Sequence, residues 1–141
     1  MAYLQLQKLI EIDADFCVIL SSMRVACVGE SNVRDQWFQI SSDLYKIGDR
    51  LKELEYSTPR GTIDFVMFRV PMGNCVQGMI IQISGLCDDE ISQLARKNCK
   101  QKLCIECNSF AQLLNDMRQK CEAQIANERR VLLQRVLELL G

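Results

Sequence analysis

The sequence predicts an α+β fold, in which an antiparallel four-stranded sheet made of two hairpins is flanked by helices. Three observations lead to this prediction: two pairs of apolar runs separated by short breaks, a heptad repeat between the two pairs, and a long apolar-striped segment toward the C-terminus. The expected order of elements is α-ββ-α-ββ-α-α. A length of 141 residues suits one domain, so residues 1–141 are expected to form a single unit.

The first predicted hairpin follows a short helix expected within the first eleven residues. Its strands are the apolar runs 15–20 and 23–29, which the polar pair Ser21-Ser22 separates. Two apolar runs around a two-residue polar break are typical of a β-hairpin. The pair lacks the Gly or Asn that the favoured hairpin turns contain.

The second predicted hairpin has strands at residues 63–70 and 76–83. Both are rich in β-branched, aromatic and other apolar residues, and the segment 71–75, which contains Pro and Gly, is expected to form the connecting loop. Asp64 interrupts the first strand. We expect this carboxylate to face solvent at a sheet edge or to pair with a cation, since an ionised group in a core needs a partner.

A strict heptad repeat between the hairpins predicts a helix of about six turns. Its apolar residues are spaced alternately by three and four positions, and a turn at residues 58–61 ends it. They are Trp37, Ile40, Leu44, Ile47, Leu51 and Leu54. Two interpretations remain open: a core helix packed on the sheet, or a coiled-coil-like seam in which Trp37, Leu44 and Leu51 contact a partner chain.

Two further helices are expected after the second hairpin. The acidic run 88–90 suits a helix N-terminus, and Ser109 with Gln112 matches a capping box at the start of a long helix over residues 108–140. The outer part of this long helix is apolar over too wide an arc for one sheet face to cover, which predicts a protein-binding surface. The residues expected to bind a partner there are Leu132, Leu133, Val136, Leu137 and Leu140.

Composition argues against catalysis and against nucleic-acid binding. The chain contains no histidine, which removes the commonest general base and the Ser-His and Cys-His nucleophilic pairs. Gly29 opens no phosphate-binding loop. The formal net charge is −1, and no basic stripe of the kind that phosphate backbones require is present. We therefore expect neither an enzyme nor a nucleic-acid-binding protein.

The eight cysteines are expected to be reduced thiols that pack as small hydrophobic groups. One alternative, a structural zinc site, remains open. Cys99, Cys104 and Cys107 read C-x4-C-x2-C, and Cys87 or Cys121 would supply the fourth thiolate that such a site needs. Without that zinc site, no metal and no cofactor are expected.

Together these observations favour a non-enzymatic adaptor or complex subunit that associates through apolar helix surfaces, with another protein chain or as a homodimer. The alternative is a small intracellular module with a structural zinc held by the cysteines. No apolar run reaches the roughly 18 residues that span a bilayer, and residues 1–8 lack the pattern of a secretory signal. We therefore expect an intracellular location, cytoplasmic or nuclear, and no membrane insertion.

Overall fold

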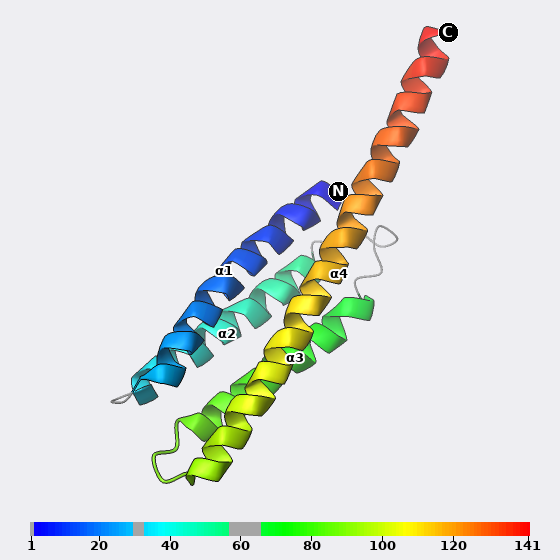
Figure 1. Ribbon diagram of the computed structural model, residues 1–141. Helices are drawn as coiled ribbons and strands as arrows, with labels where there is room; N and C mark the ends of the chain where they lie inside the picture. The colour runs from blue at the N-terminus through cyan, green and yellow to red at the C-terminus, as the bar shows by residue number, and fades with distance from the viewer. Residues whose placement is uncertain (1, 30–32, 57–65) are drawn as a thin grey trace.

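The described residues of the computed structural model, 2–29, 33–56 and 66–141, fold into an antiparallel helical bundle (Figure 1). Its helices are α1 (Ala2–Val28), α2 (Val33–Tyr56), α3 (Val66–Leu86) and α4 (Gln93–Leu140). Each helix runs antiparallel to the one before it, and α4 also packs beside α1. This is the up-down-up-down arrangement of a four-helix bundle. No strand lies within these ranges, so the prediction of an antiparallel four-stranded sheet, and with it the α+β class, is wrong.

The first predicted hairpin is wrong because residues 15–28 belong to α1. The residues of α1 that face the core recur every three or four positions, which is the period of a helix and not of a strand. They are Leu9, Ile12, Phe16, Ile19, Met23 and Ala26. Val18 and Val25 point away from the core and are exposed. These outward apolar side chains hide the helical period within two apparently continuous apolar runs.

The second predicted hairpin is wrong because α3 occupies the same part of the chain. The core-facing residues of α3 again follow a helical period. They are Phe68, Met72, Val76, Met79, Ile83 and Leu86. Pro71, expected in a connecting loop, lies inside the helix, where it has no N–H to donate to the carbonyl one turn earlier. Residues 63–65 of the predicted strand, which include Asp64, and the predicted turn at 58–61 lie outside the described residues.

A single helix, α4, replaces the two helices expected after the second hairpin. The acidic run 88–90 precedes it, and the Ser92 hydroxyl caps it by accepting a hydrogen bond from the Ala95 N–H at 3.1 Å. Ser109 and Gln112 lie exposed in the middle of this helix, so the predicted capping box does not begin one. α4 has 48 residues and is about 72 Å long at 1.5 Å per residue.

The heptad residues of α2 form one wall of the core. All six are at most 4% exposed, and they pack against neighbouring helices where a sheet was expected. Trp37, Leu44 and Leu51, which were candidates for partner binding, are therefore enclosed within this chain.

In the core between α1 and α4, the rings of Phe16 and Phe110 meet edge to face with their centroids 4.7 Å apart.

Two glycines allow α3 and α4 to approach closely. A Cβ atom at Gly78 would lie 2.6 Å from the Glu106 Cδ atom, and one at Gly85 would lie 2.8 Å from the Cys99 Sγ atom. Both separations are shorter than van der Waals contact. The two glycines are seven residues apart on α3, and the two facing residues are seven apart on α4. A heptad of one helix therefore faces a heptad of the other.

Trp37→Ala is expected to lower the free energy of unfolding by about 3–5 kcal/mol, because it removes a large buried ring and leaves a cavity. Phe38→Ala removes the neighbouring ring, which is 52% exposed and lies 5.5 Å from the Arg34 guanidinium. That loss should cost at most about 1 kcal/mol. Urea denaturation followed by far-UV circular dichroism measures both values, and equal losses would contradict the burial of the α2 heptad.

Gly85→Ala should have different effects in two backgrounds. Alanine is favoured over glycine inside a helix by about 1 kcal/mol, but the new methyl group meets the Cys99 Sγ atom. In the Cys99→Ala background the methyl group has room, so Gly85→Ala should be more favourable there by about 1 kcal/mol. Thermal unfolding of the wild type, both single variants and the double variant completes the cycle. Strictly additive effects would show that this pair does not limit the approach of the helices.

Candidate functional site

The end of α4 lies outside the bundle (Figure 1). Cys121 is the last buried residue of the helix, and every residue of the segment 129–140, here named the α4 extension, is exposed. The Arg118 Nη1 atom lies 3.2 Å from the Asp13 Oδ2 atom and aligns α4 with α1. At this register the first residues of α1 lie level with about residue 128 of α4, so the extension has no bundle helix beside it in the described part of the chain.

Apolar side chains cover one face of the α4 extension. At about 100° per residue they fall within an arc of about 160°, and their exposed fractions range from 41% to 87%. Gln134, Arg135 and Glu138 occupy the opposite side. The apolar face consists of the five residues predicted from the sequence, Leu132, Leu133, Val136, Leu137 and Leu140, together with Leu139. The structure thus places the predicted residues on one surface of a regular helix.

The apolar face points to the side of α4 along which α1 runs. Val136 follows Arg118 by 18 residues, which make about five full turns, so the two residues lie on the same side of the helix. Arg118 contacts Asp13 of α1. The apolar face therefore continues the line of α1 beyond the first residue of that helix.

This face overlaps the core stripe of α4 at one edge only. The buried residues between Leu103 and Cys121 lie about a quarter of a turn from the centre of the apolar face. Leu132 and Leu139 follow Leu114 and Cys121 by 18 residues, or five full turns, so they continue the core stripe at one edge of the apolar face. The apolar face of the α4 extension therefore begins at the line of the core stripe and extends beyond it toward the side along which α1 runs.

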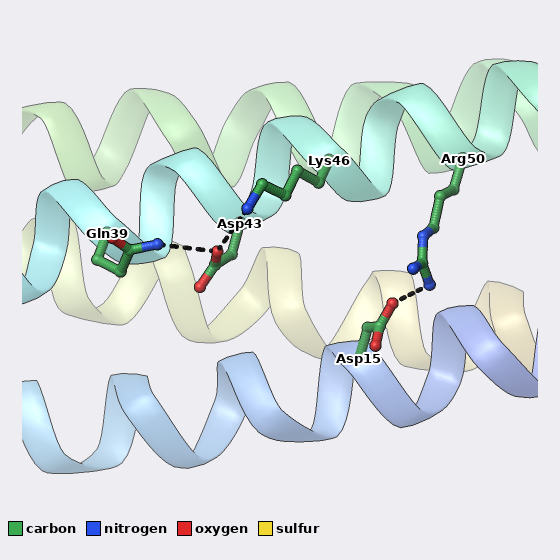
Figure 2. A network of polar contacts seen from close by, with 5 residues as sticks. All are labelled: Asp15, Gln39, Asp43, Lys46 and Arg50. Atoms are coloured by element: carbon green, nitrogen blue, oxygen red, sulfur yellow. Dashed lines mark hydrogen bonds and ion pairs between the residues drawn. The ribbon is translucent and has the colours of Figure 1, made fainter.

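A charged network crosses the groove between α1 and α2 (Figure 2). The Arg50 guanidinium of α2 contacts the Asp15 carboxylate of α1. On α2, Asp43 accepts a hydrogen bond from Gln39 Nε2 at 3.1 Å and pairs with Lys46 Nζ at 3.9 Å. The groove has a volume of about 480 Å³, but these charged groups pair with one another near solvent. Such surface pairs contribute about 0–1 kcal/mol each, which indicates a contact between helices and not a reactive site.

The cysteines predicted as zinc ligands are dispersed over the structure. Cys87 follows the end of α3, Cys99 is half-buried and Cys104 is exposed. Cys121 is buried in the core, about 21 Å along the helix from Cys107. Within the described ranges, no group of three or more His, Cys, Asp or Glu side chains could hold a metal ion. The structure therefore does not assemble the predicted four-thiolate site.

Burial raises the pKa of several cysteine thiols in the bundle. Burial raises the pKa of Cys121 to about 11. It raises the pKa of Cys107 to about 12, and the nearby Cys104 thiol and Glu106 carboxylate add smaller increases. The pKa of Cys75 rises to about 11, mainly through burial and then through the Glu106 carboxylate, to which the thiol donates a hydrogen bond. These thiols remain protonated at neutral pH and are poor nucleophiles.

No protein-family model, no curated protein and no solved structure matches this chain. Among the described residues, none of the helices combines the length and the apolarity needed to cross a membrane. The apolar face of the α4 extension is therefore the candidate site that the geometry itself identifies.

Alkylation of the folded protein with iodoacetamide should separate the cysteines by burial. Cys17 and Cys104 are exposed and should react first. Cys121 and Cys107 are more buried and have raised pKa values, so they should react at least about tenfold more slowly at neutral pH, because the thiolate is the nucleophile. Mass spectrometry of proteolytic peptides gives the rate at each site. Unfolding in urea should remove the difference, and equal rates in the folded protein would contradict the described packing.

Proposed function

We propose that this chain is a non-enzymatic subunit of a protein assembly, which binds a partner chain through the apolar face of the α4 extension. The observation that carries this proposal is a set of six exposed apolar side chains on one face of a helix that continues past its bundle. Monomeric soluble proteins rarely expose large contiguous apolar patches, and such patches usually mark interfaces.

Covering this face supplies enough free energy to support association. Its side chains are 41–87% exposed, and their burial would contribute on the order of 5–10 kcal/mol before association costs are subtracted. The extension is already helical, so little of its backbone entropy remains to be lost on binding. A preformed helix therefore retains more of the gain than a disordered segment would.

The shape of the apolar face favours a helical partner. Its arc of about 160° is wider than the two-in-seven seam of a two-stranded coiled coil, so it can contact helices along two adjacent lines. Arg130 and Arg135 flank its two edges, where acidic residues of a partner would improve the rate and the specificity of binding. The partner is either another protein chain or a second copy of this one.

Other features of the chain also support a binding role over catalysis. The sequence has no histidine, and the charged groups drawn in Figure 2 pair with one another. All eight cysteines are free, which agrees with a reducing compartment such as the cytoplasm or the nucleus. We therefore propose that the subunit resides in the cytoplasm or the nucleus.

Leu133→Glu combined with Leu137→Glu should abolish association without unfolding the bundle. Both leucines are 59% exposed in the isolated chain, so glutamates there cost the fold little, whereas an interface would have to desolvate both charges. Each change should weaken binding by about 2 kcal/mol or more if these residues are hot spots. Native mass spectrometry should find the wild type as a dimer or with a copurifying partner chain, and the variant as a monomer without that partner.

Asn127→Glu combined with Gln134→Glu provides the matched control. It adds two carboxylates to the polar side of the same helix, where both native residues are exposed, and should preserve the mass and the partner of the wild type. Circular dichroism verifies that both variants remain folded. If Leu133→Glu with Leu137→Glu retains its native mass and every interaction, or if the control loses them equally, the interface assignment fails.

A further inference from the structure

Three sulfur atoms from three different helices meet inside the bundle. The Cys107 Sγ atom of α4 lies 3.7 Å from the Met23 Sδ atom of α1 and 3.9 Å from the Met79 Sδ atom of α3. Both methionines are buried, and Cys107 is half-buried. Met23 and Met79 are 84 and 28 positions from Cys107 in the sequence, so only the fold brings these atoms together.

The spacing of the sulfur atoms suits a three-coordinate metal ion. A metal–sulfur bond of about 2.3 Å in a trigonal plane places the sulfur atoms about 4 Å apart. The separations of 3.7 Å and 3.9 Å from the Cys107 Sγ atom match the length of two edges of such a triangle.

The types of ligand select a soft monovalent ion. Thiolate and thioether sulfur prefer Cu(I), whereas Mg²⁺ and Ca²⁺ require oxygen ligands. Zinc takes four ligands drawn from Cys, His, Asp and Glu, and the described part of the chain gathers no three of these. One thiolate also neutralises one Cu(I) ion. The complex therefore brings no net charge into the apolar interior. A divalent ion bound to the same single thiolate would leave one positive charge uncompensated there.

We propose that Cys107, Met23 and Met79 bind one Cu(I) ion. On binding, the S–H bond of Cys107 breaks, its proton leaves to solvent, and an S–Cu bond forms with no change in oxidation state. The two thioethers donate lone pairs and lose no proton.

An anaerobic titration of the full chain with Cu(I) held by a coloured chelator tests this site. The wild type should remove one Cu(I) ion per chain, and X-ray absorption should report three sulfur neighbours without nitrogen or oxygen. Changes to outer-shell groups alone cost about 10–100-fold in metal affinity, so Cys107→Ser should lose at least about 100-fold. Met23→Leu with Met79→Leu removes both thioethers at conserved volume and should lose at least about tenfold, as expected for direct ligands.

Two control variants should bind Cu(I) as the wild type does. Met117→Leu removes another buried methionine, and Cys17→Ser removes an exposed thiol of α1. Circular dichroism checks each fold, and if Cys107→Ser unfolds, the double leucine variant decides. A wild type that takes no Cu(I) from the chelator, or a folded Cys107→Ser or double leucine variant that keeps wild-type affinity, overturns the proposal.

The copper site is independent of the proposed interface. Leu133→Glu with Leu137→Glu alters only exposed residues of the α4 extension, so this variant should bind Cu(I) with unchanged affinity. Loss of copper binding in that variant would contradict the assignment to the three sulfur ligands. Failure of the interface test would leave the copper prediction standing.

Discussion

α3 and α4 approach closely because Gly78 and Gly85 present no side chain to the facing helix, and Glu106 and Cys99 fill the space. Two such contacts lie one heptad apart along α3 and α4, and the Arg118–Asp13 pair marks the register of α4 against α1. That register decides which part of the long helix faces the core and which part lies beyond the end of α1. The position of the α4 extension is therefore a consequence of packing inside the bundle.

The bundle closes its core without using the α4 extension. The largest buried rings, those of Trp37, Phe16 and Phe110, lie in the part of the chain where the helices face one another. The buried residues of α4 end at Cys121, and beyond it a wider face, which overlaps the core stripe at one edge, is apolar and exposed. Because no residue of the extension is buried against the described helices, its apolar face is exposed. A change on that face can therefore affect binding without a large effect on folding.

The sequence predicts α2 correctly because its apolar residues recur at a clear helical period. It does not predict α1 and α3 as helices, because other features of their sequences obscure that period. α2 carries polar residues between its heptad positions, so its spacing was visible. In α1, the exposed Val18 and Val25 fill the gaps in the helical stripe and produce continuous apolar runs, which short strands also show. In α3, Pro71 and Gly73 are typical of turns, but packing against α2 and α4 outweighs their low helix propensity. Local patterns therefore failed where tertiary contacts decided the structure.

The two proposed sites differ in how far the sequence could predict them. The apolar end of α4 is a local pattern, and the sequence alone predicts five of its six residues. The meeting of Met23, Met79 and Cys107 depends on the register of three helices, which no local pattern encodes. α4 carries Cys107 and also the extension, whose centre lies about 40 Å further along the same helix. An ion held between α1, α3 and α4 would strengthen the packing that positions the extension, because all three ligands must remain together for it to bind. Copper would then stabilise the bundle that supports the binding surface without entering the interface itself.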